Sequence, residues 1–349
     1  MPNVTAEKLE AIARALLEGA GTPVQDAATI ARLSIAANLA GHDSHGIMLL
    51  PTYIDRVKKG HIVPDAKWDI VQETPTTTVV DGNWGFGYVV TERAMRHTIA
   101  KAKTQNVAAT TVFRQGHIGR LASYPLMAAE EGMIAMITAD SGRSPKNVAP
   151  FGGAKARLGT NPICFAVPSD LEGPLFFDMA TSAAAAGKIG VAIARGKEVP
   201  SGWLIDAEGR PTNDPAQLRK GGALLPLGGA EGYKGYGLAA MVEIFSGLLT
   251  GLGFGVDPTG RHNDGCFIAV FNVAAFRDLT TFKREVTEFA GYLNATPPAA
   301  GFERVYYPGE IEFEREKERR ANGIPIEDST WEGLRKLAAE LGVAERAGI

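Results

Sequence analysis

The spacing of hydrophobic positions near the N-terminus predicts two helices. Apolar residues recur at helical intervals from Leu9 to Leu17, and Gly19 ends this first helix. A second helix is expected from residue 22 to 39, where Thr22-Pro23-Val24-Gln25 has the form of a capping box. The polar sequence GHDSHG, residues 41–46, therefore lies at the end of the second helix or just beyond it.

From about residue 75 the pattern changes to short apolar runs between glycines, which is typical of buried strands. Strands are expected at residues 107–113, 133–139, 163–167, 174–179 and 266–271. Helices are expected at residues 47–57, 90–105, 121–131, 183–195, 235–249 and 281–293, and Ser329-Thr330-Trp331-Glu332 has the form of a capping box that opens a last helix. This order predicts an α/β fold in which a central α/β part, residues 76–241, is inserted into a discontinuous helical part formed by residues 1–75 and 242–349.

Composition narrows the class of protein. Of the 349 residues, 45% are hydrophobic and 21% are charged, as in soluble globular proteins, and the net charge of −3 disfavours nucleic acid and anionic membranes as partners. The N-terminus lacks the apolar core of a signal peptide, and no apolar run reaches the roughly 18 residues that a membrane span needs. Two cysteines do not make a disulfide framework, so a cytoplasmic protein is expected.

A glycine pattern near residue 235 partly matches the fingerprint of a nicotinamide-binding site. Gly235-Tyr236-Gly237-Leu238-Ala239-Ala240 fits G-x-G-x-x-A, and Asp257 follows about 20 residues later. That fingerprint requires a strand directly before the glycines, whereas the sequence LGGAEGYK before them indicates a loop, so we do not expect a Rossmann fold. Glycines around Lys234 before a helix could bind a phosphate, or they could form a flexible loop with a solvated lysine.

The sequence HDSH, residues 42–45, raises three chemical hypotheses. Adjacent side chains are expected to diverge, and no G-x-S-x-G elbow occurs, so a hydrolytic triad is disfavoured. A zinc site would need further ligands, but the other histidines lack an H-E-x-x-H or C-x-x-C companion, so no metal is expected. His45 therefore remains as a general acid or base, and the plainer alternative is that it caps the preceding helix.

Two more polar groups follow predicted strands. Gly116-His117-Ile118-Gly119-Arg120 comes after the strand at 107–113, where α/β folds bind ligands, although a simple turn would have the same sequence. Arg120 could hold a carboxylate with two hydrogen bonds, or it could be a surface arginine. Asp178 ends another strand, where it could orient a catalytic imidazole or cap the next helix, with Thr181 and Ser182 as rival caps.

Taken together, seven motifs resemble those of the malate/L-lactate dehydrogenase family of non-Rossmann NAD(P)-dependent oxidoreductases. They are GHDSHGI, GHIGR, APFGG…RLGTNP, FDMATS…GK, VPSGWLIDAEGRPTNDP, LGG…YKGYGLAAMVEI and YYPGE…NGIP, which run in order from residue 41 to 325. The segment PGEIEFEREKERRANGIPIEDSTW is similar to the hydroxycarboxylate dehydrogenase B branch in particular.

This resemblance implies a central mixed sheet and a homodimer with active sites near its interface. It also implies that His45 donates and accepts the proton, with Ser44 and Asp178 as its supporting partners, while His117 competes for the same role. The cofactor, NAD or NADP, would be bound by Ser141, Asp178, Met179, Ala180, Thr181, Ser182, Lys234, Gly235, Pro308, Gly309 and Glu310.

One departure from the family pattern bears on the substrate. Many members have an arginine four residues after the histidine of SHG, where this chain has Leu49, and a small residue where it has Arg120. We therefore expect Arg120 to bind the carboxylate of a 2-oxo or 2-hydroxy acid, either malate- or lactate-like or larger and aromatic. A cyclic imine carboxylate is the alternative substrate, and an Asp/Ser/His hydrolase is the alternative from a different class.

Overall fold

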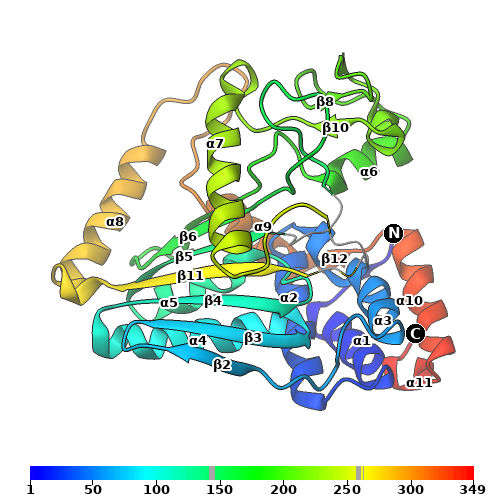
Figure 1. The fold of residues 1–349 in the computed structure, drawn as a ribbon, viewed down its shortest axis with the longest axis horizontal. Coiled ribbons are helices and arrows are strands. Elements are labelled where there is room, and N and C mark those ends of the chain that lie inside the picture. Colours follow the sequence, from blue (N-terminus) through cyan, green and yellow to red (C-terminus); the bar gives the residue numbers. More distant parts are fainter. Residues whose placement is uncertain (141–145, 257–260, 262) are drawn as a thin grey trace.

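A mixed β-sheet forms the centre of the molecule (Figure 1). The computed structural model describes residues 1–140, 146–256, 261 and 263–349. The sheet has seven strands in the order β2-β3-β4-β11-β5-β6-β7, in which β3 and β4 are parallel and the other neighbours are antiparallel. Its strands are β2 (Asp69–Glu73), β3 (Thr77–Gly85), β4 (Val107–Gln115), β5 (Met133–Asp140), β6 (Ile163–Val167), β7 (Leu175–Met179) and β11 (Gly265–Asn272).

Helices cover both faces of this sheet. Thr110 of β4 lies on the face covered by α4 (Gly87–Gln105), where its hydroxyl is 2.6 Å from that of Thr98. Thr138 of β5 points to the other face, where its hydroxyl is 2.7 Å from Ser246 in the π-helical segment η6 (Ile244–Leu248). η6 continues α7 (Gly232–Glu243), and α5 (Pro125–Glu130) packs on β5 and β6. The central strands are therefore buried between two layers, whereas β2 at the edge is exposed.

The two ends of the chain pack together (Figure 1). Strand β1 (Asn3–Val4) pairs with β12 (Ile324–Pro325), and Lys8 donates hydrogen bonds to the carbonyls of Ala347 and Gly348. The helices of this part are α1 (Ala6–Gly19), α2 (Val24–Leu39), α3 (Leu50–Lys58), α9 (Glu310–Asn322), α10 (Asp328–Glu340) and α11 (Ala344–Ala347). The apolar faces of these helices, α9 excepted, share one continuous core with the main sheet.

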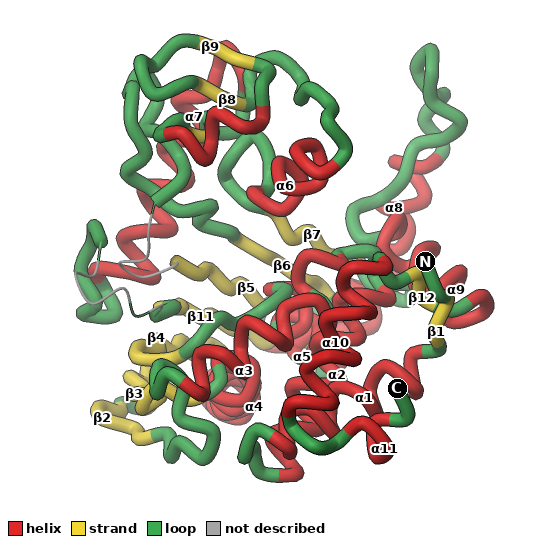
Figure 2. The backbone as a smooth tube through the Cα atoms, turned by 90° about the vertical axis from the view of Figure 1, so that its right-hand side faces the viewer, coloured by secondary structure: helices red, strands yellow, loops and turns green. Residues whose placement is uncertain are grey.

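A smaller lobe lies above the sheet, as Figure 2 shows. It contains a three-stranded sheet, in the order β10-β8-β9, and a separate core around Ile189 and Leu224. Its elements are α6 (Ala186–Ala194), β8 (Leu204–Ile205), β9 (Pro211–Thr212), η4 (Pro215–Lys220), β10 (Ala223–Leu224) and η5 (Gly229–Glu231). Helix α8 (Leu279–Asn294) follows β11 and the short turn η7 (Val273–Ala275).

The expected strands are all present, but several details of the prediction differ from the structure. Pro23, and not Thr22, is the N-cap of α2, because its extended backbone already precedes the first helical turn, and no side chain caps that helix. Likewise α10 begins at Asp328, ahead of the proposed capping box. The expected strand at 266–271 is β11, and it lies in the centre of the sheet, although residues 242–349 were assigned to the mainly helical part and not to the central α/β part. Among the described residues, every helix is too short or too polar to span a lipid bilayer.

Candidate active site

Two histidines from distant parts of the chain face each other. His45 ends the short 3-10 turn η1 (Asp43–His45) after α2, and His117 lies in the glycine-flanked turn after β4. Their rings are stacked with centroids 5.8 Å apart and planes inclined by 26°. The second turn packs closely on α4, since a Cβ atom at Gly87 would lie 2.1 Å from the Gly116 carbonyl oxygen. The fold therefore brings both predicted acid/base residues together.

The sequence expectation for Asp43-Ser44-His45 was wrong in one respect. The adjacent side chains of Ser44 and His45 do meet, with Ser44 Oγ 3.0 Å from His45 Nδ1, because the 3-10 turn is tighter than an α-helix. The Asp43 carboxylate instead accepts hydrogen bonds from Arg319 and Asn38. No described hydrogen bond completes an Asp-His-Ser relay here. The carbonyls at the end of α2 accept from backbone amides of residues 41 and 42, so that His45 is not needed as their cap.

Two buried tyrosines that the sequence analysis missed connect the histidines. Tyr53 Oη is 2.8 Å from His117 Nδ1 and 3.3 Å from Tyr88 Oη, and Tyr88 Oη lies 3.2 Å from the His45 carbonyl oxygen. A carbonyl only accepts, so Tyr88 donates its single proton there, and Tyr53 donates to Tyr88. In this arrangement His117 Nδ1 donates to Tyr53. Burial raises the pKa of both phenols, so the chain stays protonated.

The surroundings of His45 favour its neutral form. Burial of the imidazole, with smaller contributions from His42 and Arg120, lowers the pKa of His45 to about 4. Its ring is therefore uncharged at neutral pH and can accept a proton.

Arg120 is buried beside this pair of histidines. Only 8% of its surface is exposed, its guanidinium lies 5.0 Å above the Phe176 ring, and its Nε has no hydrogen-bond partner among the described residues. Burial lowers the pKa of Arg120, against an opposing effect of Asp178. The surface-arginine alternative is therefore wrong, and an unpartnered buried donor favours an anionic ligand.

Asp178 lies at the end of β7 but holds a different group from the one expected. Its Oδ2 accepts a hydrogen bond of 2.8 Å from the amide of Ala122, which lies in the turn η3 (Leu121–Ser123) directly after Arg120. Burial raises the pKa of Asp178, although Ala122 and Arg120 act in the opposite direction. No described hydrogen bond joins Asp178 to His45, and Ala185 is the N-cap of the next helix. Asp178 therefore anchors the segment that carries Arg120.

Helix α9, which the sequence analysis did not predict, borders the same site. Glu312 lies 3.4 Å from His42 Nε2, and this interaction lowers the pKa of Glu312. Glu312 and Glu316 both interact electrostatically with Arg120. They are four residues apart and so share one helical face. A strongly charged helix thus directs carboxylates toward the buried arginine.

The segments expected to bind the cofactor meet at the junction with the smaller lobe. Thr181 Oγ1 donates to the Asn161 carbonyl at 2.9 Å, and Leu227 N donates to the Thr181 carbonyl at 2.9 Å. A Cβ atom at Gly235 would lie 2.1 Å from the Leu227 oxygen, so glycine is required there. Met179 and Ala180 connect β7 to this junction, and Ser182 Oγ donates to the Ala184 carbonyl. Ser141 lies outside the described residues.

The remaining residues that were expected to bind the cofactor lie at or next to helix N-termini. Gly235 and Gly237 lie inside α7 and not in a strand-to-helix turn. Lys234 is exposed and 3.1 Å from Glu231. The Gly232 amide donates to the Gly229 carbonyl, but no side chain caps α7, so the next amides and the lysine are the groups that fit a phosphate. Pro308 and Gly309 pack on the start of β7, with the Pro308 carbonyl accepting from Phe176, and Glu310 accepts from the Tyr307 amide at 3.1 Å.

A buried charge cluster links α7 to β5 and was also missed. Lys146, whose side chain is 4% exposed, lies 3.3 Å from Asp140 Oδ1 and 3.2 Å from Glu243 Oε1. Asn161 donates to the other Glu243 oxygen at 2.9 Å. Burial raises the pKa of Asp140 to about 7, although Lys146 opposes the shift. Three distant acidic and basic positions gave no sequence signal because only the fold brings them together.

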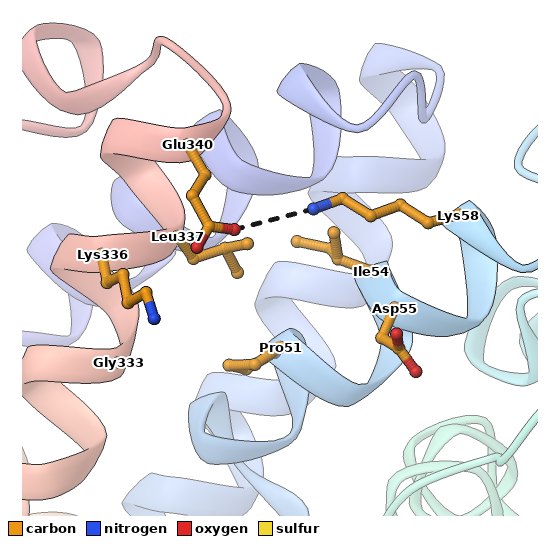
Figure 3. Close-up of a pocket in the computed structure, with 8 residues that line it drawn as sticks. All are labelled: Pro51, Ile54, Asp55, Lys58, Gly333, Lys336, Leu337 and Glu340. Atoms are coloured by element: carbon orange, nitrogen blue, oxygen red, sulfur yellow. Dashed lines mark ion pairs between the residues drawn. The ribbon is translucent and has the colours of Figure 1, made fainter.

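A cavity of about 270 Å³ lies away from this chemistry, between α3 and α10 (Figure 3). Lys58 and Glu340 form an ion pair of 3.8 Å across it, and none of the predicted site residues lines it. Leu49, the expected pocket residue, is partly buried and packs against the main core. Within the described part of the chain, no group of three or more His, Cys, Asp or Glu side chains is arranged to hold a metal ion.

Comparison with known proteins decides the family. The family model described as "Malate/L-lactate dehydrogenase" matches residues 4–335. The chain belongs to the malate/L-lactate dehydrogenase family. Malate dehydrogenase from Pyrococcus abyssi is 37% identical over 331 residues, which cover 93% of this chain and 90% of that protein.

Further members of the malate/L-lactate dehydrogenase family match this chain over nearly its whole length. Hydroxycarboxylate dehydrogenase B from Escherichia coli O157:H7 is 34% identical over 346 residues, 97% of this chain and 94% of that protein. The crystal structure of malate dehydrogenase from Entamoeba histolytica has a TM-score of 0.94 at 35% identity and covers 98% of both chains. The predicted family is thereby confirmed, the enzyme is a dehydrogenase, and the hydrolase alternative is wrong.

Proposed function

We propose that this dehydrogenase transfers a hydride between a nicotinamide cofactor and C2 of a 2-oxo or 2-hydroxy carboxylate. The observation that carries the proposal is the stacked pair His45 and His117 beside the buried Arg120, whose Nε has no hydrogen-bond partner among the described residues. Relatives named malate, L-sulfolactate, ureidoglycolate and L-lactate dehydrogenase act on molecules of this kind. A proton carrier next to a carboxylate-binding arginine is what such a reaction requires.

His45 is proposed to carry the proton. When the hydroxy acid is oxidised, the neutral imidazole of His45 accepts the hydroxyl proton of the substrate. In the reverse reaction the His45 imidazolium returns this proton to the carbonyl oxygen. Ser44 holds Nδ1 of this ring at 3.0 Å and so orients it. His117, held at Nδ1 by Tyr53, is the competing candidate for the same step.

Arg120 is proposed to bind the substrate carboxylate. Its burial and its unpartnered Nε favour an anion, and the adjacent Phe176 ring offers an apolar surface. With Leu49 in place of the arginine that many members have, the pocket is expected to accept larger or aromatic side chains than those of malate and lactate.

The cofactor is proposed to be NAD, with NADP as the alternative. It is proposed to lie along the junction formed by residues 178–182, the start of α7 and residues 308–310. The bound nicotinamide would supply or accept the hydride at C4. The amides that follow Gly232 in the first turn of α7, which no side chain caps, and Lys234 would hold a phosphate, and Thr181 and Gly235 would fix the backbone around it. This arrangement differs from a Rossmann site because the paired glycines lie within a helix.

The architecture proposed from the sequence, an α/β part inserted into a helical part, is supported by the pairing of β1 with β12. A homodimer is proposed as well. Along α7, η6 and the residue that follows η6, five apolar side chains that are each 36–56% exposed recur at helical spacing, namely Met241, Ile244, Phe245, Leu248 and Leu249. Such a stripe is normally covered by another protein surface, here by a second copy of the chain.

The experiment that tests the proposed function is a substrate panel. Pyruvate, oxaloacetate, phenylpyruvate and a cyclic imine carboxylate are each incubated with the full-length protein and either NADH or NADPH, and oxidation of the cofactor is followed by absorbance. The proposal predicts oxidation with at least one 2-oxo acid, and the fastest turnover with the aromatic one. Turnover of the imine alone would instead favour the reductase alternative, which is known among solved structures of similar fold as delta1-piperideine-2-carboxylate reductase.

A further inference from the structure

A buried arginine on α9 lies directly beneath the turn that carries His45. The sequence of α9, EIEFEREKERRAN, is dominated by charged residues, yet Arg319 is only 9% exposed. Glu312 and Arg319 are seven residues apart, so they lie on the same face of the helix. Glu312 faces His42, and Arg319 faces Asp43, which places both beside the turn.

Arg319 holds the start of the turn with both arms of its guanidinium. Nη1 donates to Asp43 Oδ1 at 2.7 Å, and Nη2 donates to Asp43 Oδ2 at 3.0 Å. Nη1 also donates to the carbonyl oxygen of Asn38, in the last turn of α2. A two-armed, charge-assisted contact of this kind fixes the orientation of the carboxylate as well as its position.

Asn38 extends this contact to the other end of the turn. Its Nδ2 donates to Asp43 Oδ1 at 2.7 Å, and its Oδ1 accepts from the Ile47 amide at 2.9 Å. The fit leaves no room for a side chain at position 46, because a Cβ atom at Gly46 would lie 2.2 Å from Asn38 Oδ1. Residues 43 and 47 are therefore both anchored, and the segment between them carries Ser44 and His45.

We propose that Arg319 is a positioning residue that sets the orientation of His45 for proton transfer. This inference rests on the proposed function, in which His45 exchanges a proton with the substrate. A 3-10 turn of three residues has little stability of its own. Without the arginine the turn can rotate, and a displacement of about 1 Å of a reacting group can lower a rate by about 100-fold.

The test compares Arg319→Met and Arg319→Lys with Arg320→Met. Arg320 is the next residue on α9, is exposed, and bonds Glu316, so its variant controls for loss of a charge from this helix. For each full-length variant, kcat and KM with the preferred 2-oxo acid, the dissociation constant of NADH and the melting temperature are measured. We expect kcat to fall about 10- to 100-fold in both Arg319 variants, with the dissociation constant changed less than about twofold.

Lysine is not expected to restore the rate, because a single ammonium cannot bond both carboxylate oxygens in a fixed plane. Asp43→Asn should lower kcat by a similar factor, and combining it with Arg319→Met should add little, since both changes break one contact. Wild-type kcat in a folded Arg319→Met protein would overturn the inference. An equal loss in Arg320→Met, or an equal loss of NADH affinity, would also overturn it.

A second readout separates this inference from the proposed function. The ring nitrogens of His45 are followed by ¹⁵N NMR in the wild type and in each variant, with His45→Gln used for assignment. If Arg319 positions the ring, the His45 signals change in Arg319→Met and remain unchanged in Arg320→Met, whether or not the substrate panel finds a turnover. Unchanged signals in both variants would contradict the positioning role.

Discussion

His45, His117 and Arg120 could be located from the sequence because each belongs to a short motif beside an expected element. Their partners could not be located in this way. Tyr53 meets His117 across 64 positions of the chain, and Arg319 meets Asp43 across 276. Such pairs have no local signature, since an inward tyrosine or a charged helical residue is common in any globular protein. The chemistry of single residues was therefore more predictable than the contacts that orient them.

The proposed binding of the substrate carboxylate by Arg120 can be tested by replacing this residue. Replacing it with Gln or Lys removes the two-armed contact with a substrate carboxylate. A hydrogen bond to a charged group is worth about 1.5–3 kcal/mol, so kcat/KM for the 2-oxo acid should fall by roughly 10- to 100-fold. Steady-state kinetics provide the measurement, and NADH affinity should change little. If both variants keep the wild-type kcat/KM, the carboxylate is bound elsewhere.

At the scale of elements, short apolar runs between glycines predicted the buried strands well, whereas the first residues of the helices were less predictable. The capping boxes failed because Pro23 and Glu327 precede the helices with extended backbone, which moved each start away from the expected residue. Helix α9 was missed because its charged sequence lacks an apolar stripe, and in the fold its inward face is filled by ionic contacts instead. Hydrophobic periodicity cannot detect a helix that is held in place by charges.

The cluster that joins β5 to α7 predicts a pH dependence of stability. Asp140 has a pKa of about 7 in the folded protein and near 3.8 as a free side chain. Between these values the folded state retains a proton that the unfolded state has lost, so this group makes the free energy of unfolding decrease as pH rises, by at most ~1.4 kcal/mol per pH unit. Below about pH 4 its stabilising contribution is complete.

Asp140→Asn should remove that dependence. Guanidinium unfolding at pH 5, 6, 7 and 8 would measure it: relative to wild type, the variant should gain stability as pH rises through 7. Parallel stability curves for the two proteins would show that Asp140 does not titrate in this range.

At the scale of the whole molecule, the exposed apolar stripe on α7 and η6 predicts self-association. Light scattering should give a mass twice that of the 37.0 kDa chain. Leu248, 48% exposed in the single chain, lies in the middle of the stripe. Leu248→Glu should shift the molecule toward the monomer, because a buried carboxylate without a partner opposes association. A monomeric wild type would contradict the proposed dimer.

His45→Ala is the sharpest test of the proposal that His45 exchanges the proton with a 2-oxo or 2-hydroxy acid. NADH affinity, measured by fluorescence titration, should remain within about twofold of wild type, because this histidine is not part of the proposed cofactor junction. Turnover of the preferred 2-oxo acid should fall by about 10²- to 10⁴-fold, the usual contribution of a general acid or base. A variant that keeps wild-type turnover would rule out His45 as the proton carrier and assign the proton transfer to His117.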